Sequence, residues 1–130
     1  MIESTRDPAP PASLTITYAE ELEDAKTLSI SPEIEAVLGY TQAEWMADPL
    51  IWVRLMHPED RDRVVLACAE SNRLGQPFDA TYRMIARDGR VVRIHDHAEL
   101  VRGSQDQPLV WQGVMVPDEE REEASNDSGE

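Results

Sequence analysis

The sequence lacks any long hydrophobic run. None of its 130 residues belongs to a stretch near the roughly 18 to 20 consecutive apolar residues that cross a bilayer. Residues 1–13 are acidic and rich in proline, whereas a signal peptide is first basic and then apolar. We therefore expect a cytoplasmic protein that does not contact a membrane.

Cysteine and positive charge are also scarce. With Cys68 as its only cysteine, the chain can form neither an internal disulfide nor a cysteine-rich metal site. The 12 basic residues stand against 26 acidic ones, so the formal net charge is -14. Because this charge repels phosphate backbones, we expect no binding to nucleic acid.

Motifs of common enzyme classes are absent as well. The chain has no Gly-x-Ser-x-Gly elbow, no Gly-rich phosphate loop that ends in Lys-Ser or Lys-Thr, and no His-Glu-x-x-His helix. Glu59 and Asp60 are adjacent carboxylates, but helix capping accounts for them, with Asp60 accepting early backbone hydrogen bonds. The sequence therefore predicts no catalytic residues and no enzyme.

The charge and proline patterns divide the chain into three parts. Residues 1–12 contain three prolines and no hydrophobic periodicity, which predicts a flexible lead-in. Residues 13–117 have the size and apolar content of one folded domain. Residues 118–130 carry seven carboxylates and one arginine, which predicts a disordered acidic tail.

Five segments of the domain are expected to be strands. Leu14, Ile16 and Tyr18 alternate with other residues at a period of two, and an acidic turn at 20–24 separates them from a short strand at 26–30. Segments 78–86, 90–101 and 109–116 are rich in β-branched and aromatic residues. Asp88-Gly89 suits a tight hairpin turn between the first two of these segments.

Short helices and one long helix lie between these two groups of strands. A short helix from Pro32 ends at Gly39, and Thr41 precedes Glu44 at the spacing of a capping box. The longest helix runs from Pro58 to about Leu74. Its inward face is predicted to be Val64, Ala67, Cys68, Ser71 and Leu74. The order of elements predicts an α+β domain, with one antiparallel sheet and helices on one face.

Several motifs in this order resemble a PAS domain, most closely the PAS fold-3, PAC-like subgroup found in sensor domains of bacterial signalling proteins. They are Ser-Pro-Glu-Ile-Glu-Ala-Val-Leu-Gly-Tyr at 31–40, Trp52 followed by His-Pro-Glu-Asp-Arg at 57–61, Tyr-Arg-Met at 82–84, Arg-Asp-Gly-Arg at 87–90 and Trp-Gln-Gly-Val at 111–114. The resemblance implies a five-stranded antiparallel sheet that holds a helical layer, with a ligand cavity between sheet and long helix. It implies sensing rather than catalysis.

The resemblance leaves the cofactor unknown but disfavours two groups. Haem-binding PAS domains take an axial histidine from the long helix, and this helix has none. His57 precedes the helix and is interpreted as part of the motif that starts it. Flavin photoreceptors need a reactive cysteine in an Asn-Cys-Arg-like sequence, whereas Cys68 lies in Leu-Ala-Cys-Ala. Haem and covalent flavin photochemistry are therefore not expected.

A small organic ligand remains an alternative, because Ala67, Cys68 and Ser71 are small and leave room between helix and sheet. The candidate lining residues of this cavity are Val64, Cys68, Ser71, Tyr82, Met84, Ile94 and Trp111. In the opposing interpretation, Met84 and Trp111 fill the space themselves.

Two histidines mark a candidate interaction surface. His95 and His97 leave the same face of one strand, about 6 to 7 Å apart. Of the neighbours on that face only Glu99 could add a metal ligand, so no metal site is predicted. The candidate interface residues are Arg93, His95, His97 and Gln112.

The leading hypothesis is a regulatory PAS module that acts by protein–protein contact, as a homodimer or docked to a signalling partner, and is gated by a small ligand in its core. The alternative is a small-molecule sensor domain that is a fragment of a histidine kinase or diguanylate cyclase. Pro117 and the acidic residues after it replace the Asp-Ile-Thr-like signature that leads related domains into an output enzyme. The sequence leaves both a free-standing protein and a fragment open.

Overall fold

The computed structural model describes residues 14–22 and 26–118. The expected lead-in at 1–12, and the expected tail apart from its first residue, lie outside the described residues. Within them, no helix combines the length and the apolar character needed to cross a membrane.

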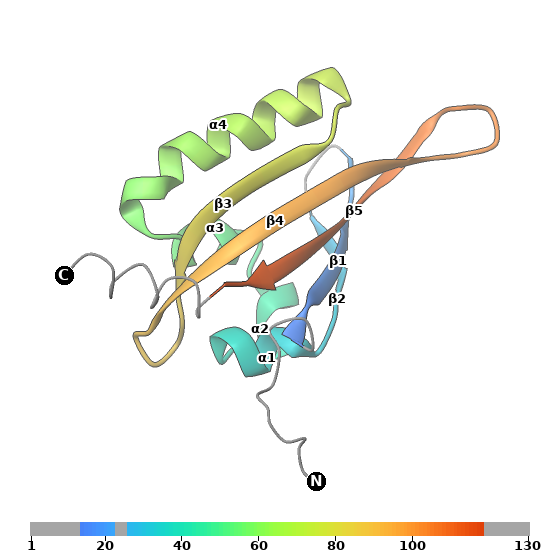
Figure 1. Cartoon of the computed structure of the whole chain (residues 1–130). Helices are drawn as coiled ribbons and strands as arrows, with labels where there is room; N and C mark the ends of the chain where they lie inside the picture. The colour runs from blue at the N-terminus through green and yellow to red at the C-terminus, as the bar shows by residue number, and fades with distance from the viewer. Residues whose placement is uncertain (1–13, 23–25, 119–130) are drawn as a thin grey trace, which may run out of the picture.

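One antiparallel sheet of five strands forms the centre of the molecule (Figure 1). The strands are β1 (Ile16–Glu20), β2 (Thr27–Ile30), β3 (Phe78–Ile85), β4 (Val91–Arg102) and β5 (Pro108–Pro117). Their order across the sheet is β2-β1-β5-β4-β3, so the first and last strands of the chain are neighbours. The predicted five-stranded α+β fold is confirmed.

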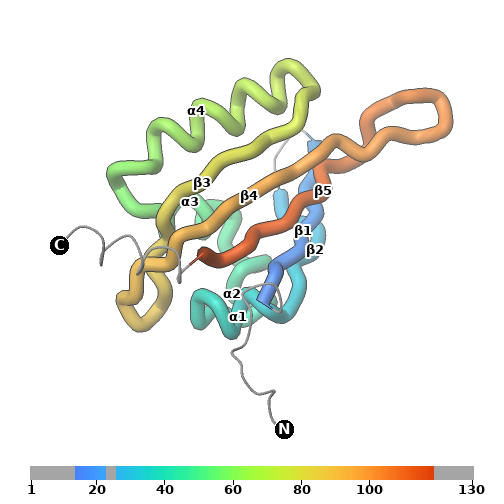
Figure 2. Tube along the Cα trace, in the orientation of Figure 1, coloured from blue at the N-terminus to red at the C-terminus, as the bar shows by residue number. Residues whose placement is uncertain are grey.

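The four helices of the described residues lie together on one face of this sheet (Figures 1 and 2). They are α1 (Glu33–Leu38), α2 (Gln42–Ala47), α3 (Ile51–Leu55) and α4 (Pro58–Leu74). The inner face of the sheet and these helices enclose the hydrophobic core, and the described residues leave the outer face of the sheet without a covering helix.

Local signals start and end the short helices as the sequence predicts. The Thr41 hydroxyl accepts a hydrogen bond from the Glu44 backbone N–H at 3.0 Å, and the Glu44 carboxylate accepts one from the Thr41 N–H at 2.9 Å. Gly39 ends α1 with a φ of 85°, a left-handed conformation that glycine adopts at little cost. The predicted capping box and glycine cap are therefore confirmed.

The predicted inward face of α4 is too wide. Val64 is fully buried and Cys68 and Ser71 are half-buried, but Ala67 is exposed and Leu74 is 48% exposed. The helix packs mainly against β3, an edge strand, and therefore turns only a narrow stripe toward the sheet. The assignments of Ala67 and Leu74 to the core are wrong for this reason.

The start of α4 is fixed to β3 near the C-terminal end of that strand. The Asp60 carboxylate accepts hydrogen bonds from the Arg83 backbone N–H at 2.8 Å and from its guanidinium at 2.9 and 3.0 Å. The His57 N–H donates to the Arg83 carbonyl, and its ring Nδ1 accepts from the Glu59 N–H. The expected backbone hydrogen bonds to Asp60 thus come from β3 rather than from its own helix. This correction explains why the His-Pro-Glu-Asp-Arg and Tyr-Arg-Met motifs occur together.

Candidate functional site

A cavity of about 240 Å³ lies between the inner face of the sheet and the helical layer. All five strands line the cavity on the side of the sheet. On the helical side, the lining comes from the segment from α2 to α3 and from one stripe of α4. The lining comprises Tyr18, Glu20, Thr27, Ile30, Trp45, Asp48, Pro49, Leu50, Ile51, Trp52, Val53, Cys68, Ser71, Asn72, Phe78, Asp96, Ala98, Trp111 and Met115.

Aromatic side chains form much of the wall. The Trp52 ring meets Phe78 and Tyr82 edge to face, with ring centroids 6.3 and 5.9 Å apart. The Trp111 indole N–H donates to the Asn72 side-chain oxygen at 2.7 Å, which joins β5 to α4. These contacts fix the rings in place, so the walls are rigid and largely apolar.

A buried carboxylate, Asp96, lies on the inner face of β4 and is only 2% exposed. It accepts hydrogen bonds from the Tyr18 hydroxyl at 2.7 Å and the Tyr82 hydroxyl at 2.6 Å. The Trp52 indole N–H in turn donates to the Tyr82 oxygen at 2.8 Å. Burial raises the pKa of Asp96 to about 6, although the two tyrosine hydrogen bonds oppose this rise by stabilising the carboxylate.

A second acidic group, Glu20, lines the same cavity from the end of β1. Burial, followed by the negative charge of Asp96, raises the pKa of Glu20 to about 7. Within residues 14–22 and 26–118, neither carboxyl forms an ion pair. Neither carboxyl of the cavity therefore has an ion-pair partner among the described residues, although His95 on the outer face lowers the pKa of Asp96 electrostatically.

We expect Glu20→Gln to stabilise the protein at neutral and higher pH. Because the folded-state pKa of Glu20 lies above its ordinary value of 4.5, the native state binds more protons and loses stability as pH rises from about 4.5 to about 7. The neutral amide removes this loss. The gain should be near zero at pH 4 and about 3 kcal/mol above pH 7, since the pKa rises from 4.5 to about 7 on folding.

Urea unfolding of both proteins across this pH range measures the difference in the free energy of unfolding. Glu21→Gln is the control, since Glu21 follows Glu20 and does not line the cavity. A difference that is constant with pH would contradict the assigned burial of the Glu20 charge.

Three of the seven predicted cavity residues, Cys68, Ser71 and Trp111, line the cavity. The other four lie in the adjoining hydrophobic core and are not part of the lining. These are Val64, Tyr82, Met84 and Ile94. Met84 is fully buried and Trp111 forms a wall of the cavity. These two side chains do not fill the space between helix and sheet, because a cavity of about 240 Å³ remains.

Sequence reasoning missed Glu20 and Asp96. The sequence predicts Glu20 in an acidic turn, whereas Glu20 continues the inward alternation of Ile16 and Tyr18 and pairs with Trp111 of β5. Asp96 lies between two outward histidines, so their alternation already required it to point inward. The period-two pattern of each strand predicts both positions: Glu20 is the next inward position after Tyr18, and Asp96 is the inward position between His95 and His97.

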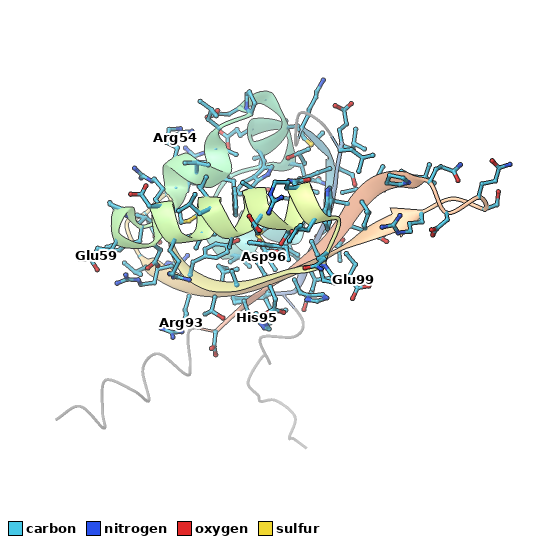
Figure 3. All side chains as sticks on the ribbon, turned by 90° about the horizontal axis from the view of Figure 1, so that it is seen from above. Arg54, Glu59, Arg93, His95, Asp96 and Glu99 are labelled. Carbon is cyan, nitrogen blue, oxygen red and sulfur yellow. The ribbon has the colours of Figure 1, made fainter. Side chains whose placement is uncertain are left out.

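The four predicted interface residues, Arg93, His95, His97 and Gln112, lie on the outer face of the sheet. In Figure 3, Arg93 and His95 lie on the side of the sheet opposite α4, whereas Asp96 lies between the sheet and α4. Gln112 pairs with Glu99 on this face, and both are exposed.

Acidic neighbours surround the two histidines of this face. The His97 ring lies 2.8 Å from Asp79 and 2.9 Å from Glu99, and the His95 ring lies 3.0 Å from Asp79. Hydrogen bonds to Glu99 and Asp79 raise the pKa of His97, and the histidines lower that of Asp79. Across the described ranges, no three acidic, histidine or cysteine side chains are arranged to hold a metal ion.

Comparison with known proteins places this geometry in a family. The PAS fold family matches residues 27–115. A methyl sulfide methyltransferase-associated sensor from Methanosarcina acetivorans is 25% identical over 88 residues, which are 67% of this chain and 9% of that protein. The chain thus spans less than a tenth of the length of this relative.

Two solved structures share the fold. The N-terminal domain of a diguanylate cyclase with a PAS/PAC sensor from Marinobacter aquaeolei is 32% identical, with a TM-score of 0.72 over 79% of this chain and 94% of that one. A sensory box histidine kinase/response regulator from Burkholderia thailandensis is 18% identical, with a TM-score of 0.69 over 89% of this chain and 86% of that one. Since the family match covers more than half of the sequence, the chain belongs to the PAS fold family, whose members are sensor domains of signalling proteins.

Proposed function

We propose that this PAS domain is a non-catalytic regulatory module of the cytoplasm that transmits its signal by pairing with a second copy of the chain through the outer face of its sheet. The observation that carries the proposal is the outer face itself, which the helices of the described residues leave uncovered. Within the described residues, this face is open to contact along β4 and β5.

The charges of this face suit a symmetric contact. Basic and acidic side chains alternate over a short distance, with Arg93, His95 and His97 beside Asp79 and Glu99. In a two-fold interface the same surface meets itself, so a mixture of both signs permits each copy to place its positive groups against the negative groups of the other. The net charge of -14 makes two copies repel each other at any face, so this interface has to set opposite charges against each other to form.

Gln112→Glu should weaken self-association about tenfold, because it adds a negative charge beside Glu99 in each of the two copies. Sedimentation velocity over a range of protein concentrations measures the dissociation constant. Gln76→Glu is the matched control, since Gln76 is exposed in the connection between α4 and β3, outside the strands that carry the proposed interface. The proposed interface would be contradicted if the wild-type protein stays monomeric at high concentration. It would also be contradicted if the two variants weaken self-association equally.

The cavity favours a second candidate function, that of a ligand-gated sensor. A mostly apolar cleft or cavity with a few polar groups is the usual form of a small-molecule site. In this candidate, the domain is part of a longer histidine kinase or diguanylate cyclase, the classes of protein in which the two structural neighbours occur. Native mass spectrometry tests it together with the subunit number, through a non-covalent mass that disappears on denaturation.

A further inference from the structure

We propose that the cavity binds a small organic monoamine, with its ammonium group beside Glu20 and Asp96 and its apolar body against the tryptophan walls. This inference rests on the ligand-gated candidate function, because it names the chemical class of ligand for the same cavity. Three features of the lining support it: the sign of its charges, the balance of hydrogen-bond donors and acceptors, and the size of the space.

The charged groups of the lining are all acidic. Glu20, Asp48 and Asp96 line the cavity, and the described residues place no lysine, arginine or histidine in the lining. Asp48 pairs with Arg54 outside the cavity, so its charge is already offset. Glu20 and Asp96 have no ion-pair partner in the part of the chain that the structure describes, and they raise each other's energy when both are ionised. A cation placed beside them offsets this repulsion, whereas an anionic ligand would increase it.

The hydrogen bonds around the two carboxyls leave acceptors without donors. The Tyr18 and Tyr82 hydroxyls donate to Asp96, and the Ser71 hydroxyl donates to the Pro77 carbonyl. A carboxylate offers about four acceptor sites, so Asp96 retains capacity and Glu20 retains more. An ammonium group brings three donors and no acceptor, and charge-assisted hydrogen bonds of this type are the strong ones.

The size and walls of the cavity select the rest of the ligand. An apolar cavity of about 150 Å³ holds a benzene molecule, so the volume of about 240 Å³ has room for one ring with a short amine chain. Trp45, Trp111 and Phe78 offer flat apolar surfaces, and the faces of such rings also attract cations. A polyamine with several hydrated charges would lose too much solvation against these walls.

Binding should release a proton and therefore strengthen with pH. The groups that face Glu20 are Tyr18 on its own strand, Asp96 on β4 and Cys68 on α4, and among these Asp96 is the group that carries charge near neutral pH. Because the pKa of Glu20 is about 7 in the empty protein, the amine must displace a proton below that pH. The affinity should rise about tenfold between pH 6 and pH 8.

The test is calorimetric titration of the full chain with three probes that share a ring and differ in charge: phenethylamine, 2-phenylethanol and 3-phenylpropionate. We expect phenethylamine to bind at least about tenfold more tightly than the neutral alcohol, and the carboxylate to bind most weakly. Benzylamine and cyclohexylmethylamine extend the amine series to other apolar bodies.

Two pairs of variants assign the binding to this cavity. Glu20→Gln should weaken phenethylamine about tenfold and leave the alcohol unchanged, while Glu21→Gln should bind as the wild type does. Cys68→Phe should abolish binding by filling the space, and Ala69→Phe, on the exposed side of the same helix, should not. Circular dichroism confirms the fold of each variant, and the stability gain of Glu20→Gln separates lost binding from unfolding.

The outcomes distinguish the two levels of the proposal. If the alcohol or the carboxylate binds as tightly as the amine, and Cys68→Phe removes that binding, the amine class is wrong and the ligand-gated function stands. If none of the probes binds at millimolar concentration, both the amine site and the ligand-gated function are overturned. Amine binding that survives both Glu20→Gln and Cys68→Phe overturns the proposed site.

Discussion

Replacing Gly113 with alanine should destabilise the protein by about 3 kcal/mol, through overpacking and the loss of a charge-assisted hydrogen bond. Gly113 lies on β5 directly opposite Tyr18 of β1. A Cβ atom at this position would lie 2.5 Å from the Tyr18 hydroxyl oxygen and from the ring carbon that carries it. The tyrosine ring would have to move, and Asp96 would lose one of its two tyrosine donors.

Chemical denaturation of Gly113→Ala measures this loss, and two controls test its cause. Gly103→Ala places a Cβ atom against the flexible end of the Gln107 side chain in the β4–β5 turn, so its effect should stay below about 0.5 kcal/mol. Tyr18→Ala removes the ring and hydroxyl that the new Cβ atom of Gly113→Ala would approach too closely. The double variant should therefore be less destabilised than the sum of the two single variants. Additive effects would show that the close approach of Tyr18 is not the cause.

The same glycine shows how far the sequence predicts the site. The Trp-Gln-Gly-Val motif identified a strand and a family, and both are confirmed. The reason for glycine at this position could not be read from the sequence, because it depends on Tyr18, which is 95 positions earlier in the chain (113 minus 18). Local periodicity predicts which face a residue occupies, whereas the packing of one strand against a distant strand requires the sheet order.

The sheet order also explains which cavity residues were foreseen. The spacing of one helix and the pattern of one strand predict Cys68, Ser71 and Trp111, and these elements do face each other. Trp45 and Trp52 lie on helices whose position over the sheet follows from the loops between them, and no periodicity in the sequence specifies that position. Glu20 and Asp96 break the hydrophobic pattern of the inner face, which is expected where function rather than stability selects the residue.

The second large effect concerns Asp60, where replacement by asparagine should destabilise the protein by about 2 to 3 kcal/mol. Asp60 is 6% exposed, and its carboxylate accepts from both the backbone and the guanidinium of Arg83. The amide keeps the size of the side chain but removes the charge, so the Arg83 guanidinium loses its buried partner. Part of this cost is recovered because Arg83 is partly exposed and also contacts Glu59.

Asp62→Asn is the matched control for Asp60→Asn, since Asp62 is an exposed aspartate on the same helix. Urea unfolding should show a change below about 0.5 kcal/mol for the control. Equal destabilisation of the two variants would contradict the assignment of Asp60 as the residue that fixes α4 to β3.

The effect of Asp60→Asn on the free energy of unfolding should depend on pH, and this dependence provides a further test. The Asp60 carboxylate stabilises the fold as pH rises, whereas the Glu20 carboxylate destabilises it. Hydrogen bonds from Arg83 hold the pKa of Asp60 well below its ordinary value of 3.8. Its contribution is therefore fully present above about pH 4 and is lost as the pH falls below that value. The difference between wild type and Asp60→Asn should shrink toward pH 2, whereas the gain from Glu20→Gln grows above pH 4.5. These two contributions together place the greatest stability of the wild type near pH 4 to 5, below the pH at which the cavity carries its full negative charge.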